Sequence, residues 1–484
     1  MSRGASPSAP WVQSVPLHAK GGPDPEVGRP NLPQPASGWY FLAMYRLFSW
    51  EHSYFSGKAR GYLRFKERSG ALGPGFEDIL ASADLIQALL VPRSGSGAVP
   101  QMQAPDGSWI QDSSEIIDFC EAAHPEAPVI PDPATSPCQC LAAYLIELLA
   151  DEWMVVPGFW ERWHYSEDGR ELSHRGFNEQ QWGAVLAPDA PGPMRRAAGA
   201  GFFEAAFGIS NSRSDPKGVY AGLVHLGVDE NTEPAWQASQ HRLLGLLETH
   251  FSAHDYIFGG TPSLADFGLL APLYAHLYRD AVPGFALRTH FPLVAEWVER
   301  TNGEGALNAR MYGQSLYSVS EAGELTARPA TSDGGKWLDA DAIPESLIPV
   351  LEVFFEEMWP VLKSAAGRLT DYIASDEHTA GGELPGKTFT ATPGFDALQT
   401  GDGPLTHAFE IGGVGGRRMV VPYQIWMLQR VEKALGRCTA SENGKKAVEE
   451  LLARFEGGTE LLDLQALLAG CRVRKERSLL FAEN

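Results

Sequence analysis

The periodicity of the apolar residues changes near Pro125, and this change restricts the possible folds more than any other feature of the sequence. Before it, the apolar run at residues 39–48 is typical of a buried strand and residues 76–80 of a second short strand, and a helical segment follows each. After it, strand-like runs give way to apolar residues at helical spacing, beginning with the stripe from Leu141 to Trp153. We therefore expect a mixed α/β domain followed by an all-α domain.

The order of elements in the first part of the chain predicts its topology. The strand, helix and strand of residues 39–80 require a crossover, which makes the two strands parallel. Extended segments at 99–102 and 109–110 flank a tight turn at 105–107, which is typical of an antiparallel hairpin, and a helix follows at 116–123. The predicted domain is a small mixed sheet with helices on its faces.

The chain is too long for these two domains alone. Its 484 residues, 44% of them hydrophobic, predict two or three folding units. Residues 1–38 are rich in Pro, Gly and Ser and predict a flexible leader. We place the α/β domain at 39–126, the helical domain at 135–303, and a mainly helical extension of unknown role at 337–484, with a Gly-rich hairpin at 406–421.

Charge and cysteine content disfavour several classes of function. The chain has 39 Lys and Arg against 60 Asp and Glu, a net charge of −21, which disfavours nucleic acid as a partner. Its 5 cysteines lack the spacing of a metal site and favour a reducing compartment. No run of eighteen apolar residues and no secretory pattern occurs, so we expect a cytoplasmic protein without a membrane span.

Two motifs of the α/β domain could each form part of a binding site. Val99-Pro100 opens the third strand, where a cis peptide would turn the Val99 backbone groups outward toward a peptide-like ligand. Asp112 and Ser113 precede a helix whose free N–H groups attract a carboxylate, and Asp112 could accept from an ammonium group. This turn could hold an amino-acid head group. A strand-initiating proline and an ordinary helix cap are the alternatives.

Ser53 and Ser56 lie in the turn after the first strand, just before a helix. The N-terminal end of that helix would stabilise an anion, and a serine hydroxyl could donate to a thiolate. Lowering a thiol pKa by about 2 units corresponds to about 2.7 kcal/mol. A helix-capping serine is again the alternative.

In order and spacing, these motifs resemble the N-terminal domain of the glutathione transferase superfamily. The resemblance rests on residues 53–63 (SYFSGKARGYL), on Val99-Pro100 and on residues 110–116 (IQDSSEI). Residues 263–267 (SLADF) also resemble the capping box that starts a central helix of the family's helical domain. Covering about residues 39–303, the resemblance implies a thioredoxin-like domain followed by a glutathione-transferase-type helical domain.

The resemblance also implies roles for individual residues. Glutathione would be the cofactor, with Val99 and the adjoining Pro100 at its cysteinyl group. Asp112 and Ser113 would hold its γ-glutamyl end. Ser53 would activate its sulfur as the catalytic residue, although Tyr54 and Ser56 compete with Ser53 for this role.

The co-substrate is expected where the two domains meet. Aromatic side chains there could line a pocket for a flat apolar molecule, and the candidates are Tyr54, Trp153, Phe159, Trp160 and Trp163. Core packing is the alternative for rings of this size.

We therefore predict a glutathione-dependent transferase or lyase, in which the glutathione thiolate attacks an electrophilic small molecule, as in detoxification. The alternative is a non-catalytic, metaxin-like binding or interaction protein, which the long extension favours. The resemblance implies a homodimer formed through the two domains, unless the extension takes the place of the second subunit.

Overall fold

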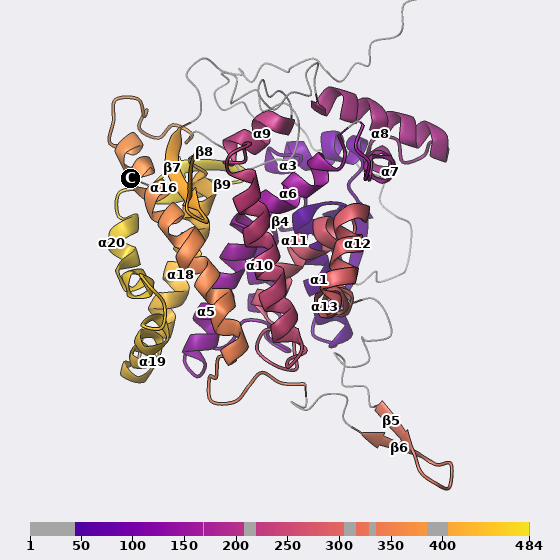
Figure 1. Ribbon diagram of the computed structural model, residues 1–484, viewed down its shortest axis with the longest axis vertical. Helices are drawn as coiled ribbons and strands as arrows, with labels where there is room; N and C mark the ends of the chain where they lie inside the picture. The colour runs from indigo at the N-terminus through magenta and orange to yellow at the C-terminus, as the bar shows by residue number, and fades with distance from the viewer. Residues whose placement is uncertain are drawn as a thin grey trace, which may run out of the picture. The chain divides into compact units, whose positions relative to one another are not determined.

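The computed structural model describes residues 44–167, 169–207, 219–303, 316–328, 335–384 and 405–483 (Figure 1). The predicted leader, residues 1–38, lies outside the described residues, as does the start of the first predicted strand.

A four-stranded mixed sheet forms the first part of the described chain. Its strands are β1 (Tyr45–Ser49), β2 (Phe76–Leu80), β3 (Gln101–Gln103) and β4 (Trp109–Gln111), in the order β2-β1-β3-β4. The helices of this part are α1 (Tyr54–Arg68), α2 (Ala83–Leu85), η1 (Ile86–Leu90), α3 (Val91–Ser94) and α4 (Ser113–Ala123). β1 and β2 are parallel, and β3 is antiparallel to both β1 and β4. The predicted mixed topology is confirmed.

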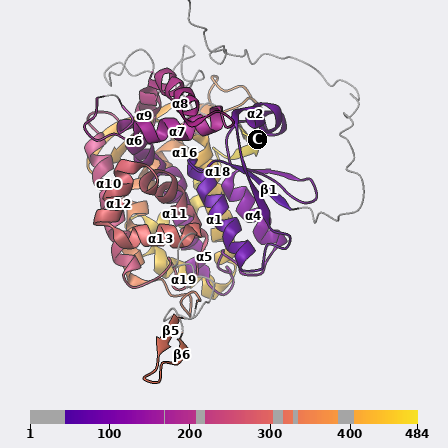
Figure 2. The ribbon, with the colours of Figure 1, turned by 90° about the vertical axis from the view of Figure 1, so that its right-hand side faces the viewer.

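The register of the strands separates two apolar faces. Leu47 on β1 pairs with Met102 on β3, and both are fully buried in the core that α1 and α4 cover. Phe48, the next residue, faces the other way and packs with Leu90 and Trp109. This alternation follows from the two-residue period of a strand. α1 packs against α4 on one side and, on the other, against α11 (Leu264–Pro272) of the helical part that follows (Figure 2).

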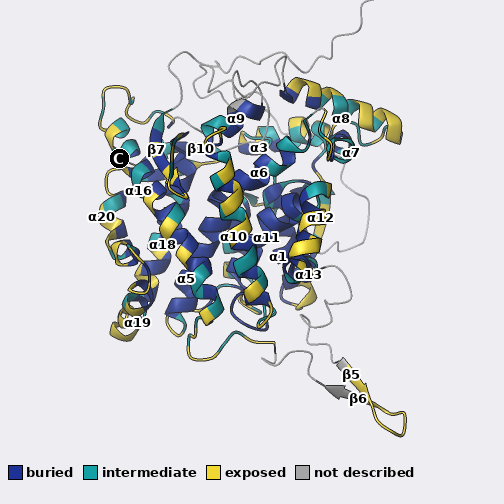
Figure 3. Cartoon of the chain, viewed as in Figure 1, coloured by how far each residue is buried: buried dark blue, intermediate teal, exposed yellow. Residues whose placement is uncertain are grey.

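The second part is helical. Its helices are α5 (Pro137–Glu152), α6 (Val155–His164), α7 (Arg175–Leu186), α8 (Gly192–Phe207), α9 (Val219–His225), α10 (Glu233–Phe251), α11 (Leu264–Pro272), η2 (Leu273–Tyr278), α12 (Ala281–His290) and α13 (Pro292–Asn302). Every residue of α5 and α11 is buried, so the core centres on these two helices (Figure 3). None of the described helices combines the length and the apolar character that a membrane span requires.

The start of α11 confirms the predicted capping box. The Ser263 side chain accepts from the first turn of the helix, and the Asp266 carboxylate accepts from the Ser263 N–H at 2.8 Å. Asp266 also accepts from the Ile257 N–H and from the Trp297 indole N–H. Gly268 then lets α11 approach α5 closely, because a Cβ atom there would lie 2.9 Å from the Glu147 Cα atom.

The extension is mainly helical and shares the same core. It contains η3 (Glu345–Leu347), α15 (Ile348–Val353), η4 (Phe354–Met358), α16 (Trp359–Ile373), α18 (Pro422–Cys438), α19 (Glu442–Leu452), η5 (Gly458–Asp463) and α20 (Leu464–Leu468). Its hairpins are β7 (Thr406–Ile411) with β8 (Val414–Met419), as predicted, and β9 (Val473–Glu476) with β10 (Leu479–Ala482); a separate hairpin, β5 (Leu316–Val319) with β6 (Leu325–Arg328), precedes the extension. α18 packs along α5, so the extension joins the helical core.

Candidate functional site

A small cavity of about 90 Å³ brings together residues from all three predicted domains. Its lining includes four of the predicted site residues, namely Val99, Pro100, Asp112 and Ser113. The lining also includes Phe55, Gln111, Asp151, Glu152, Val155, Tyr423, Lys475 and Ser478. The cavity therefore contains the predicted head-group site together with residues of the extension.

Ser53 lies beside this cavity at the start of α1. It caps the helix by accepting from the Ser56 N–H at 3.4 Å, and its hydroxyl donates to the Val99 carbonyl, also at 3.4 Å. The Val99-Pro100 peptide is cis. The Ser53 side chain is only partly buried, so its hydroxyl can still reach a ligand.

The two competing side chains of this turn are buried and occupied. Tyr54 is 3% exposed, its hydroxyl donates to the Ala150 carbonyl at 2.5 Å, and burial raises its pKa well above the ordinary value. Ser56 is fully buried and accepts from the Trp50 N–H at 3.3 Å. Of the three candidates, only Ser53 is accessible.

Asp112 and Ser113 form the start of α4. The Asp112 carboxylate accepts from the Ser114 N–H at 2.9 Å as a helix cap. Its φ angle of 96° is unusual for a residue with a side chain and costs on the order of 1–3 kcal/mol, the kind of strain that concentrates at functional sites. Within the described residues, the Ser113 hydroxyl makes no hydrogen bond and lines the cavity.

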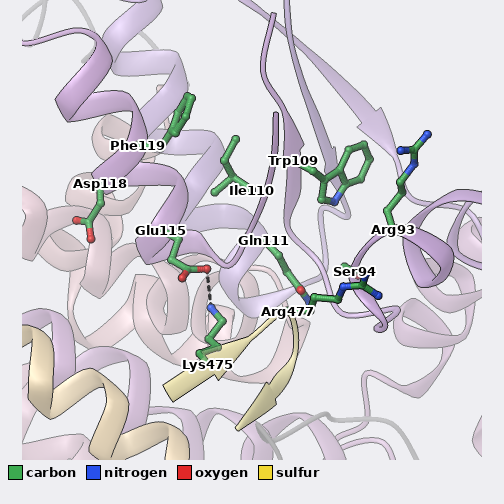
Figure 4. A pocket seen from close by; sticks show the side chains of 10 residues that line it. All are labelled: Arg93, Ser94, Trp109, Ile110, Gln111, Glu115, Asp118, Phe119, Lys475 and Arg477. Atoms are coloured by element: carbon green, nitrogen blue, oxygen red, sulfur yellow. Dashed lines mark hydrogen bonds and ion pairs between the residues drawn. The ribbon is translucent and has the colours of Figure 1, made fainter. Parts of the chain in front are cut away.

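Two residues of the extension contact the Asp112 carboxylate. The Tyr423 hydroxyl donates to it, and the Lys475 Nζ atom lies 3.4 Å from it. Lys475 also pairs with Glu115 at 2.7 Å (Figure 4). Its Nζ atom lies over the Trp426 ring. Burial opposes the ionisation of Asp112, but Lys475 and Tyr423 outweigh burial and hold its pKa below the ordinary value.

A network of buried charged side chains adjoins the cavity at Asp151. Lys58 on α1 is fully buried and donates to Ser114 at 2.9 Å, to Glu147 at 2.7 Å and to Asp151 at 2.5 Å. Arg430 on α18 reaches Glu147 at 3.1 Å. The network thus joins the α/β part, α5 and the extension.

Asp151 is the member of this network that faces the cavity. Its Oδ2 atom binds Lys58, but its buried Oδ1 atom has no partner among the described residues. Burial, reinforced by the neighbouring Glu147, raises the pKa of Asp151 to about 7. The cavity therefore has a carboxyl group that changes charge near neutral pH and an acceptor atom that is free.

An open groove of about 550 Å³ lies on the other side of Lys475. Trp109, Phe119, Arg93 and Arg477 line it, and Figure 4 shows Arg93 beside Trp109. Lys475 and Gln111 line both this groove and the cavity, so the two hollows adjoin each other at these side chains.

None of the rings predicted to form an aromatic pocket lines this cavity. The candidate rings are at most 5% exposed and belong to the core, and they are Tyr54, Trp153, Phe159, Trp160 and Trp163. Trp153 stacks on Trp236, with ring centroids 4.5 Å apart, and Trp163 packs on Phe203 at 5.6 Å. The rings of α6 are buried because neighbouring helices pack over the aromatic face of α6, as α8 does through Phe203. The apolar wall of the cavity comes from Phe55 and Val155 instead.

Sequence reasoning also missed the residues that the extension contributes. Tyr423 is 311 positions from Asp112, and Lys475 is 360 positions from Glu115. The local sequence around Tyr423 and Lys475 shows no motif that would connect them with the start of α4.

Comparisons with known proteins identify one part of the chain. Residues 220–300 match the family model described as "Glutathione S-transferase, C-terminal domain". No curated protein matches the chain.

Solved structures with a similar fold include three bacterial proteins. A glutathione S-transferase from Rhodospirillum rubrum F11 is 16% identical, with 62% of this chain and 100% of that chain covered and a TM-score of 0.33. The β-etherase LigF from Sphingobium sp. strain SYK-6 is 18% identical, with 55% and 98% covered and a TM-score of 0.35. A glutathione S-transferase from Methylobacterium radiotolerans JCM 2831, in complex with glutathione sulfonate, is 22% identical, with 57% and 99% covered and a TM-score of 0.30.

Proposed function

We propose that this chain, which belongs to the glutathione transferase superfamily, is a glutathione-dependent transferase or lyase that acts on an electrophilic small molecule. One observation carries the proposal. Val99, Asp112 and Ser113 line a single cavity, and the accessible hydroxyl of Ser53 contacts Val99 at its edge.

The groups around the cavity suit the γ-glutamyl end of glutathione. That end is an amino-acid head group, with one carboxylate and one ammonium. The Ser113 hydroxyl is available to the carboxylate, and the Oδ1 atom of Asp151 is available to the ammonium. The Asp112 carboxylate could also accept from the ammonium if the ligand displaced the 3.4 Å contact with Lys475. Pockets for whole drug-sized ligands measure about 300–1,000 Å³, so a cavity of about 90 Å³ would take this head group alone.

Bound glutathione would supply the thiol that attacks the electrophile. The chain would supply the environment of that thiol. The Ser53 hydroxyl would donate to the sulfur, and the N-terminal end of α1 would stabilise its negative charge. Phe55 and Val155 would exclude water from the adjoining part of the site.

One observation favours the alternative of a non-catalytic binding protein. Tyr423 and Lys475 already contact the Asp112 carboxylate, and only 6% of the Lys475 side chain is exposed. If these contacts never open, glutathione cannot reach Asp112, and the fold would serve interaction with other molecules.

Calorimetric titration of the full chain with glutathione tests the proposal. We expect binding that Ser113→Ala weakens by about 10-fold, the effect of losing one hydrogen bond to a charged group. Ser53→Ala should lower the rate of conjugation to 1-chloro-2,4-dinitrobenzene by about 10–100-fold while glutathione affinity stays within about 2-fold. Ser69→Ala, at the other end of α1, is the matched control. Absence of glutathione binding to the wild-type chain would refute the proposal.

A further inference from the structure

We infer that Lys475 of the extension is a substrate-binding residue, which pairs with the α-carboxylate of the γ-glutamyl group. The inference rests on the proposed function and adds a recognition element to it. It assigns a role to the C-terminal hairpin, β9 with β10, whose Lys475 lines both the cavity and the open groove. Figure 4 shows Lys475 among the residues that line the open groove.

The charges around the cavity are the first argument. An amino-acid head group presents one negative and one positive group, so a complementary site needs a cation as well as an acid. Three carboxyl side chains line the cavity, those of Asp112, Asp151 and Glu152. Among the described residues of this lining, Lys475 is the only cation. The extension therefore supplies the one positive charge that the substrate carboxylate needs.

The position of Lys475 is the second argument. Its main ion pair is with Glu115 at 2.7 Å, outside the cavity lining, and the Trp426 ring lies 4.4 Å from its Nζ atom. These contacts hold the Lys475 ammonium group in place independently of Asp112. The contact with Asp112 is longer, at 3.4 Å, so a ligand could replace it without removing the main partner of Lys475.

Exchange of charges is the third argument. When a zwitterionic head group binds between Asp112 and Lys475, its ammonium would pair with the Asp112 carboxylate and its carboxylate would pair with the Lys475 ammonium. Asp112 and Lys475 would each keep an opposite charge beside them, so binding would avoid the free-energy cost of an unpaired buried charge. The unpartnered oxygen atoms of Asp151 and Gln111 provide further acceptors for the ammonium.

The competing explanation is that Lys475 occupies the ammonium position and closes the site. The two explanations predict opposite effects of removing its charge. A substrate-binding lysine strengthens glutathione binding, and its loss weakens affinity. A closing lysine competes with glutathione, and its loss increases affinity.

The test uses the full chain, calorimetry and two ligands. The ligands are glutathione and 4-aminobutanoyl-cysteinyl-glycine, which lacks only the α-carboxylate. We expect Lys475→Met to weaken glutathione binding by about 10–100-fold and to change the affinity for the analogue by less than about 2-fold. Lys475→Arg, which keeps the positive charge, should retain part of the affinity. Lys446→Met, at an exposed position of α19, is the control for loss of a lysine from the extension.

The wild-type chain provides a measurement that does not depend on the folding of a variant. It should bind glutathione about 10–100-fold more tightly than the analogue, and in Lys475→Met this preference should disappear. Equal wild-type affinity for the two ligands overturns the inference.

The remaining outcomes separate the inference from the proposed function. If Lys475→Met binds glutathione as well as the wild type, or more tightly, the inference is wrong and the glutathione site remains. If only Lys475→Met binds glutathione, the inference is wrong, the hairpin is a closing element, and the proposed function of the wild-type chain fails as well. If neither protein binds glutathione, the proposed function fails, and the inference fails with it.

Discussion

Replacing Lys58 by Met should destabilise the chain to an extent that depends on pH. Lys58 is fully buried and holds Glu147 and Asp151 together. After its removal, Glu147 keeps Arg430 at 3.1 Å, but Asp151 loses the only cation that pairs with it among the described residues. The cost therefore depends mainly on whether Asp151 is ionised.

The magnitude follows from the protonation of Asp151. Its pKa is about 7 in the wild type, because burial disfavours the charged form, and loss of Lys58 should raise it further. A carboxyl group whose folded-state pKa is raised loses stability as pH rises above its unfolded pKa, by up to about 1.4 kcal/mol for each pH unit until the folded pKa is passed. At pH 6 both proteins carry a protonated Asp151, and the loss should be about 1–3 kcal/mol from unsatisfied hydrogen bonds. At pH 9 it should reach about 3–5 kcal/mol, the cost of breaking a buried ion pair.

Urea unfolding of the wild type and Lys58→Met at pH 6 and pH 9 measures this difference. Adding Asp151→Asn to Lys58→Met should remove most of the pH dependence. Lys363→Met, which breaks a pair between side chains 37% and 51% exposed, should cost at most about 1 kcal/mol at either pH. An equal loss at both pH values for Lys58→Met, or no effect of Asp151→Asn, would refute the reasoning.

Three further perturbations test the packing and the charges. Gly268→Ala should lower the free energy of unfolding by urea by about 1–3 kcal/mol, because its Cβ atom would meet the α5 backbone at Glu147. Gly245→Ala, with open space around it, should be neutral or stabilising. Equal effects of the two variants would contradict the packing argument. Asp266→Ala should cost at least about 3 kcal/mol, since three buried N–H donors lose their acceptor, and a loss below about 1 kcal/mol would be inconsistent with these bonds. Glutathione affinity measured by calorimetry should rise between about pH 6 and pH 8 as Asp151, with a pKa of about 7, ionises, and a wild-type profile that Asp151→Asn leaves unchanged would exclude this carboxyl group.

If the extension takes the place of a second subunit by packing along α5 through α18, light scattering should give the mass of a monomer, about 52.6 kDa, and twice that mass would show that it does not.

Local pattern was sufficient to predict the sheet and the start of α11. The apolar run that contains β1 and the helical stripe of α1 reflect which side chains must be buried, and that requirement acts over a few residues. The capping box at Ser263 and Asp266 is equally local, since both partners lie within one helical turn. The same holds for the pairing of Val99-Pro100 with Asp112 and Ser113, which the short hairpin of β3 and β4 brings together.

Two parts of the candidate site could not be predicted in this way. The aromatic side chains of α6 have the composition of a ligand pocket, but whether a ring lines a cavity depends on what covers the helix, and Trp163 meets Phe203. Tyr54 was a candidate for contact with the thiol until the structure showed its hydroxyl bonded to the Ala150 carbonyl. Side-chain orientation and the neighbouring helix decided both cases.

The sequence by itself determined the element types and the short motifs at Ser53, Val99 and Asp112, because each depends on residues a few positions apart. The order of those elements along the chain then determined the mixed topology of the sheet. Only the tertiary structure showed that the extension reaches the start of α4. Lys475 and Glu115 are 360 positions apart, and their pairing depends on the packing of α18 along α5 and of the last hairpin beside it. No local propensity specifies a contact over that separation; it results from the burial of apolar surface by the whole chain.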